Sequence, residues 1–130
     1  MKIRQWDETA EKFRKVKDKP GCPIDEGIFE TVVALNILDI TTTMSCEGHL
    51  DHGLPYPWVD TLPQDYDHLC DLLAAFYAGR VIAVDRRIGF MPGRRDGCRI
   101  QSQGGGDPQK LSEYQQEMRE FAEFLKSLAS

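Results

Sequence analysis

An apolar stripe near the C-terminal end is the feature that most constrains the fold of this chain. Apolar residues recur there at intervals of 3, 4, 3, 4 and 3, the spacing of one helix face, at Leu111, Tyr114, Met118, Phe121, Leu125 and Leu128. Asp107 and Pro108 supply the start signal for this helix. An amphipathic helix needs a second element to cover its apolar face, so we expect this one to pack on a core. The same stripe also suits a homodimer formed through the C-terminal helix.

The rest of the chain alternates between helix and strand patterns. Helical periodicity covers three further segments, residues 7–18, 25–39 and 64–78, and Asp25 is the expected N-cap of the second. Strand patterns cover four segments, residues 40–46, 58–59, 81–90 and 99–103. The turn-rich segment 92–97 joins the last two strands as a hairpin. The order ααβ(loop)βαββα predicts a single α+β domain, residues 1–130, with a small, mostly antiparallel sheet of about four strands covered by helices.

Charge is strongly segregated along the chain. The net charge is −5, yet the segment between Pro20 and Gly79 has ten acidic residues and no Lys or Arg. The following segment carries six arginines, at positions 80, 86, 87, 94, 95 and 99. Arginine grips planar anions such as phosphate or carboxylate, so these side chains indicate an anion site. Alternatively they pair with the acidic half of the same protein. Overall acidity argues against broad nucleic-acid binding.

Cysteine usage and hydropathy bear on location. The four cysteines, Cys22, Cys46, Cys70 and Cys98, are widely spaced and form no CxxC motif. We find no apolar segment typical of a signal peptide and no run long enough for a membrane span. The cysteines are therefore expected to be thiols in a cytoplasmic protein.

Side chains with metal-binding capacity concentrate in one short segment. Cys46, Glu47, His49, Asp51 and His52 fall within seven positions, after a strand pattern and before a loop rich in Gly and Pro. Cys46, His49 and His52 follow each other at intervals of three, which lets one loop wrap an ion. Thiolate and imidazole are zinc ligands, and Asp51 or Glu47 can supply a fourth. A zinc site is one hypothesis, and with it a metal-dependent hydrolase.

The same segment supports two other hypotheses. In one, His49 activates the Cys46 thiol as a nucleophile. In the other, the segment binds a nucleotide-like or other anionic small molecule, which is our leading prediction. Ser45, Glu47 and Gly48 would contact this ligand with Cys46, His49 and His52. Aromatic rings and guanidinium groups would complete the pocket, from Tyr56, Trp58, Arg86, Arg94, Arg95 and Arg99.

The run Thr42–His49, preceded by the helical segment from Pro23, resembles the wybutosine-synthesis methyltransferase family. Ser45, Cys46 and Gly48 match the family motif, in which a strand ends in Ser–Cys–Ser–Gly–Arg. The resemblance implies a ligand at the end of this strand and, for the family's activity, S-adenosylmethionine-dependent modification of a guanosine in tRNA. Glu47 stands where the family has Ser, and His49 where it has Arg. The same stretch also resembles small bacterial and phage proteins with an S-C-x-G-H core.

Overall fold

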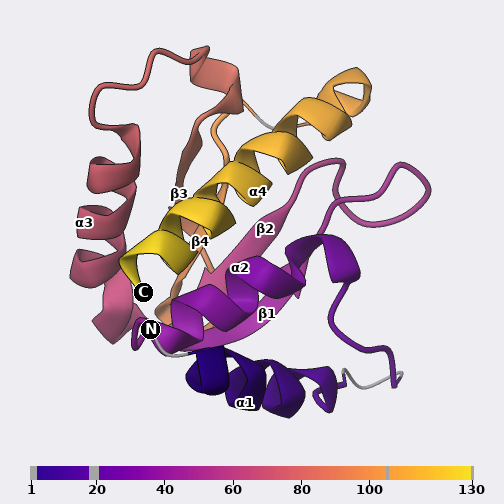
Figure 1. The fold of residues 1–130 in the computed structure, drawn as a ribbon. Helices are drawn as coiled ribbons and strands as arrows, with labels where there is room; N and C mark the ends of the chain where they lie inside the picture. Colours follow the sequence, from indigo (N-terminus) through magenta and orange to yellow (C-terminus); the bar gives the residue numbers. More distant parts are fainter. Residues whose placement is uncertain (1–2, 18–20, 105, 130) are drawn as a thin grey trace.

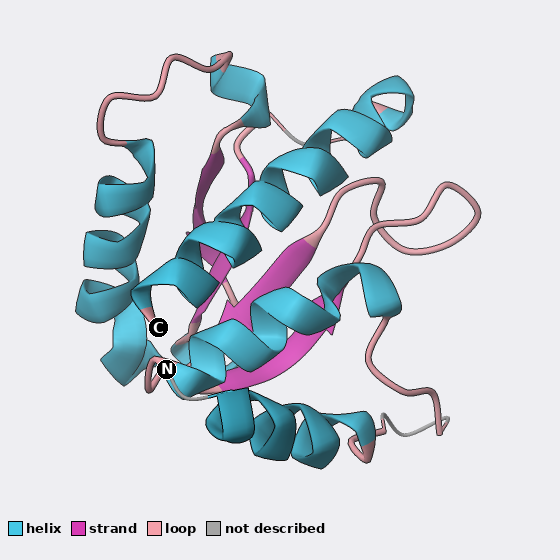
Figure 2. Cartoon of the chain, in the orientation of Figure 1, coloured by secondary structure: helices cyan, strands magenta, loops and turns pink. Residues whose placement is uncertain are grey.

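The part of the chain that the structure describes contains four α-helices and a four-stranded antiparallel sheet (Figures 1 and 2). The computed structural model describes residues 3–17, 21–104 and 106–129. The helices are α1 (Ile3–Arg14), α2 (Glu26–Ile37), α3 (Tyr66–Tyr77) and α4 (Leu111–Leu128). The strands are β1 (Thr42–Cys46), β2 (Trp58–Thr61), β3 (Ile88–Pro92) and β4 (Cys98–Ser102). The predicted α+β class is confirmed, and along the chain the elements follow as α1, α2, β1, β2, α3, β3, β4 and α4.

The order of the strands across the sheet is β1-β2-β4-β3, and every neighbouring pair is antiparallel. Trp58 at the start of β2 pairs with both Cys46 and Gln101, whereas Thr61 at its end pairs with Thr42 and Cys98. This register places the loop that joins β1 to β2 at one end of the sheet. The turn that joins β3 to β4 lies at the other end.

The helices α2 and α4 cross one face of the sheet, and α3 lies beside β3 (Figure 1). Val59 and Ile100 at the centre of the sheet, both fully buried, pack in one cluster with Val32 and Leu35 of α2 and with Phe121 of α4. Side chains alternate between the two faces along a strand. Trp58 and Arg99, the chain neighbours of Val59 and Ile100, therefore point to the face away from α2 and α4. The core therefore lies between the sheet and its helices.

The apolar stripe of α4 belongs to this core. Tyr114, Met118, Phe121 and Leu125 are each at most 1% exposed. These four side chains are thus covered by the protein's own residues, whereas Leu128 of the same stripe is 47% exposed, and a homodimer through this helix stays a prediction. Glu117 lies among these side chains and is also fully buried. It accepts hydrogen bonds from Tyr77 Oη (2.7 Å) and from both terminal nitrogens of Arg80 (2.9 and 3.0 Å).

Two predicted element boundaries are wrong. The predicted strand 81–90 begins only at Ile88, because Val81 and Val84 are exposed and residues 84–86 form a 3₁₀ turn. The first helix, predicted at 7–18, starts four residues earlier at Ile3 and ends at Arg14, and residue 18 lies outside the described residues. In the described parts of the chain, every helix is too short or too polar to cross a lipid bilayer.

Candidate metal centre

Three side chains from two separate segments meet at the end of β1. Asp25 immediately precedes α2, Cys46 is the last residue of β1, and His49 lies three residues further on. One ligand atom from each lies within 4.8 Å of the other two. His49 Nε2 is 3.1 Å from Asp25 Oδ2, and all three side chains are half-buried. Carboxylate, thiol and imidazole groups at this separation can hold one metal ion.

Backbone hydrogen bonds hold the two segments together. The Glu47 N–H donates to Asp25 Oδ2 at 3.1 Å, and the Gly27 N–H at the start of α2 donates to Glu47 Oε2 at 3.0 Å. A carboxylate is favourable at a helix N-terminus, where backbone N–H groups lack partners within the helix. Glu47, predicted to bind a ligand, therefore fastens β1 to α2. Asp25, predicted to cap α2, makes no side-chain cap bond and faces His49 instead.

Gly48 allows the chain to turn between Cys46 and His49. Its φ is +89°, and a Cβ atom there would lie 2.7 Å from Leu111 Cδ1 and 2.8 Å from the Tyr56 carbonyl carbon. Its N–H donates to Cys46 Sγ at 3.4 Å. Gln115 of α4 donates to the Glu47 carbonyl oxygen at 3.0 Å. The fold thus surrounds the start of this loop with α2, β1 and α4, and glycine is required at its centre.

His52 and Asp51 form a second, more exposed group around His49. Among the described residues, His49, Asp51 and His52 are the other trio within 4.8 Å. Asp51 Oδ1 lies 2.9 Å from His52 Nδ1, and the His49 and His52 rings stack with centroids 4.1 Å apart and planes 20° apart. Imidazole binds a metal in the plane of its ring. One ion cannot lie in both of these nearly parallel planes, so the Asp25 trio has the better geometry.

The three residues predicted to bind one zinc ion, Cys46, His49 and His52, therefore do not form a single group. His49 belongs to both trios, but Cys46 and His52 fall in different ones. Asp25 is the residue that sequence reasoning missed as a ligand. The sequence signal for Asp25 is its spacing from Cys22. The two residues are three positions apart, the same interval as between Cys46 and His49.

Burial and neighbouring carboxylates set the electrostatics of the cluster. Burial raises the pKa of the Cys46 thiol, and the nearby carboxylates of Asp25 and Glu47 raise it further, against the opposing hydrogen bond from Gly48. Hydrogen bonds from its own backbone and from His52 lower the pKa of Asp51. A bound cation would favour the thiolate and offset the repulsion among these anionic groups.

Two of the six arginines in this segment pair with buried acidic residues of the protein itself. Arg99 makes two hydrogen bonds to the buried Asp60 carboxylate, at 2.6 and 3.0 Å, and its guanidinium lies 3.9 Å from the centre of the Trp58 ring. Arg80 pairs with the buried Glu117. For these two residues, pairing with the protein's own acids is the correct interpretation of the arginine-rich segment.

The remaining predicted arginines do not join the loop at a single pocket. Arg94 and Arg95 belong to the turn between β3 and β4, at the opposite end of the sheet from the loop that follows β1. Arg95 lines a surface pocket with Thr43, Met44, Thr61 and Leu62. Arg86 ends the 3₁₀ turn before β3, the edge strand farthest from β1. The pairing register, which local sequence does not reveal, separates these groups.

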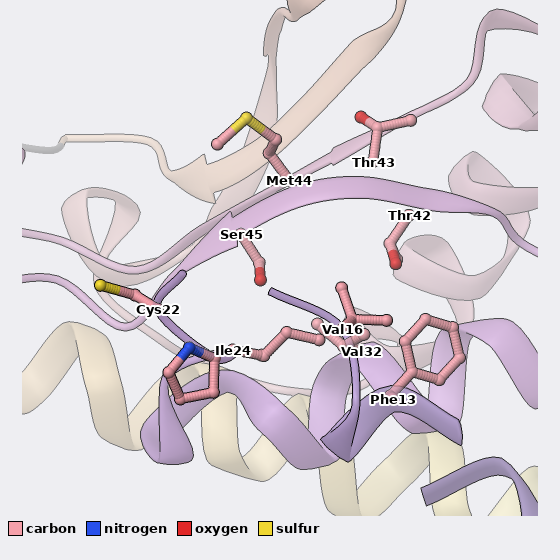
Figure 3. Close-up of a pocket in the computed structure, with 10 residues that line it drawn as sticks. Phe13, Val16, Cys22, Ile24, Val32, Thr42, Thr43, Met44 and Ser45 are labelled. Atoms are coloured by element: carbon pink, nitrogen blue, oxygen red, sulfur yellow. The ribbon is translucent and has the colours of Figure 1, made fainter. Parts of the chain in front are cut away.

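Ser45 and the aromatic residues take other positions. Ser45 points away from Cys46, into a cavity of about 120 Å³ between β1 and the α1–α2 region (Figure 3). Trp58 is only 9% exposed, beneath Arg99, and Tyr56 is half-buried in the loop. Trp58 is therefore a packing residue in this arrangement.

Comparison of the chain with protein-family models, with curated proteins and with solved structures gives no match. The resemblance to wybutosine-synthesis methyltransferases therefore stays a prediction, and the case for function depends on the geometry of the site.

Proposed function

We propose that this protein is a metal-ion-binding domain that holds zinc between Asp25, Cys46 and His49. The observation that carries the proposal is the meeting of three different ligand types within 4.8 Å, one of them brought by a segment more than 20 residues away. Zinc accepts oxygen, sulfur and nitrogen ligands together and favours a tetrahedral set of four. Magnesium and calcium prefer oxygen ligands alone, so the thiol and imidazole favour zinc over either ion.

The charge around the site also supports a cation over an anionic ligand. Asp25, Glu47 and Asp51 lie around the cluster, whereas Arg99, on the same face of the sheet as Cys46, is paired with the buried Asp60 carboxylate. An anionic or nucleotide-like molecule at the cluster would face these carboxylates, and the Arg99 guanidinium nearby already binds Asp60. Binding of such a molecule, the use of S-adenosylmethionine and metal-dependent hydrolysis stay predictions.

The proposal is tested by measuring zinc in protein prepared without a metal-affinity tag. We expect one zinc per chain by elemental analysis, and native mass spectrometry should show the ion lost after chelation. Asp25→Asn and His49→Ala should weaken zinc binding by more than the roughly 10–100-fold that follows loss of a group outside the ligand set.

His68→Ala is the matched control, because His68 is exposed on α3 and belongs to neither trio. Its zinc affinity should equal that of the unchanged protein. Equal affinity in all three variants would refute the assignment of the ion to this cluster.

A further inference from the structure

One edge of the sheet has backbone groups that face away from it. The strand β3 lies at this edge and is bonded to β4 on one side. Just before β3, the Arg87 carbonyl accepts a hydrogen bond from the Gln103 N–H at 2.6 Å. Just after it, the Gly93 N–H donates to the Gly97 carbonyl at 2.9 Å. Hydrogen-bonded positions of an antiparallel pair recur at every second residue, so the Phe90 N–H and C=O face away from β4.

The helix α3 lies beside this outward-facing edge (Figure 1). Ile88 has the same phase as Phe90, and its N–H donates to Tyr77 Oη of α3 at 2.7 Å. The carbonyl groups of Ile88 and Pro92 face outwards with those of Phe90, while Pro92 has no N–H. The edge therefore presents the Phe90 N–H and the carbonyls of all three residues to an added strand.

A groove runs between β3 and α3. A hollow of about 320 Å³ lies at the Ile88 end and one of about 480 Å³ at the Pro92 end, and Phe90 lines both. On the helix side the lining residues are spaced four apart, at Tyr66, Cys70, Ala74 and Ala78. Tyr66 is 45% exposed and Met91 is 48% exposed, so apolar surface in the groove meets solvent. The small members of the helical row leave room for an extended chain beside β3.

The two ends of the groove carry opposite charges. Arg87 lines the Ile88 end, and Asp96 lines the Pro92 end. In the described ranges of the chain, neither side chain forms an ion pair. A peptide antiparallel to β3 would place its C-terminus beside Arg87 and its N-terminus beside Asp96, so each end would meet the opposite charge. A parallel peptide would meet like charge at both ends, and the antiparallel direction is therefore favoured.

Tyr77 determines where an added strand ends. Its hydroxyl already accepts the Ile88 N–H, and its ring lies 4.3 Å from the Arg87 guanidinium. Strand pairing cannot continue past Ile88 on this edge. A chain terminus therefore suits this end of the groove better than an internal segment of a partner does.

We propose that this groove binds the C-terminal segment of a partner protein as a fifth strand, antiparallel to β3, with its terminal carboxylate on Arg87. One peptide residue would exchange two hydrogen bonds with Phe90, and its side chain would enter the groove beside Cys70 and Ala74. Main-chain bonds supply affinity in this mode of recognition, and alternate side chains supply specificity. The groove lies at the edge of the sheet opposite β1, so its use is independent of the proposed zinc site.

Backbone amide exchange, followed by NMR, tests the open edge without any ligand. We expect the Phe90 amide to exchange with solvent faster than the Met91 amide, because the same alternation bonds Met91 to Arg99 of β4. Equal protection of the two amides would overturn the proposal, since the edge would then be closed.

Synthetic peptides are the probe for the groove itself. The library has a free C-terminal carboxylate and is randomised at its last five positions, to match the five residues of β3. Fluorescence anisotropy measures the affinity of the selected peptide. Amidation of its C-terminus, or Arg87→Gln in the protein, should each weaken binding by about 10–100-fold, because each removes a charge-assisted hydrogen bond. Arg119→Gln is the control for charge, because Arg119 is exposed on α4 and lines neither hollow.

A pair of neighbouring alanines on α3 provides the control for position. Ala74→Arg should abolish peptide binding, because the new side chain fills the groove. Ala75→Arg should keep full affinity, since Ala75 is equally exposed but lines neither hollow. Asp25→Asn, at the proposed zinc site, should also leave peptide binding unchanged.

Three results would overturn the proposal. One is a library that yields no binder, and another is a selected peptide that binds Ala74→Arg as tightly as Ala75→Arg. The third is a dimer in sedimentation that Ala74→Arg dissociates and Ala75→Arg does not, because a second copy of the chain would then occupy the groove.

Discussion

Replacing Glu117 by glutamine should destabilise the fold by about 3 kcal/mol. Glu117 is fully buried, and its two carboxylate oxygens accept three hydrogen bonds, one from Tyr77 and two from Arg80. An amide of the same shape can still accept from Tyr77, but its NH₂ group faces the Arg80 guanidinium. Hydrogen bonds to charged groups are worth about 1.5–3 kcal/mol each, and breaking a buried ion pair costs about 3–5 kcal/mol.

We take the lower end of that range because the Arg80 side chain is 28% exposed and regains some hydration. With a urea m-value of roughly 1.5–2 kcal/mol/M, a loss of about 3 kcal/mol lowers the unfolding midpoint by about 1.5–2 M. Urea titration followed by circular dichroism and by tryptophan fluorescence measures this shift.

Glu120→Gln provides the matched control. The Glu120 carboxylate is also near Arg80, at 3.6 Å, but it is 46% exposed. Exposed ion pairs contribute about 0–1 kcal/mol, so this variant should unfold close to the unchanged protein. A midpoint shift in Glu117→Gln no larger than that of Glu120→Gln would refute the reasoning that burial makes the Glu117 network important.

Two further predictions concern the loop after β1 and the buried thiol of β4. Gly48→Ala should cost about 3 kcal/mol, because an L-residue at positive φ costs about 1–2 kcal/mol and overpacking adds about 1–3 kcal/mol. Gly53→Ala, at φ +66° with no atom within 4 Å, should show only the first cost in the same urea titration. Burial raises the pKa of Cys98 from 9.0 to about 11, so the folded state holds this proton more tightly than the unfolded chain. The contribution of Cys98 to stability should be complete below pH 9 and fall as pH rises toward 11, a decline that should be smaller in Cys98→Ala.

Local periodicity was sufficient to predict the helices and their order, because each buried face is encoded within one segment. In α2, Ile28, Val32 and Leu35 recur at the spacing of one helix face, and all three are buried. The same reasoning started the strand at residues 81–90 too early, because β3 begins only at Ile88. Val81 and Val84 have β-type side chains, yet no core lies against them, and the chain adopts a turn. Burial against other segments, which a local pattern does not contain, decides such cases.

Contacts between distant segments also limited the prediction of the candidate site. Cys46 and His49 were identified from their spacing, and they do lie together. Asp25 looked like a helix cap, and its approach to His49 depends on how α2 docks on β1. The distance of Arg94 and Arg95 from the loop depends on strand register, which requires knowing which strands pair. Both are long-range properties of the folded chain.

The short loop closed by the cluster has a consequence for how the protein folds. Asp25 and His49 are 24 residues apart, whereas the contacts of Tyr77 and Arg80 with Glu117 join residues 40 and 37 positions apart. Shorter loops cost less entropy to close, and local contacts generally form faster. The unit of α2 and β1 can therefore assemble early, before α4 docks. An ion bound at that stage would act on the rate of folding as well as on the stability of the finished protein.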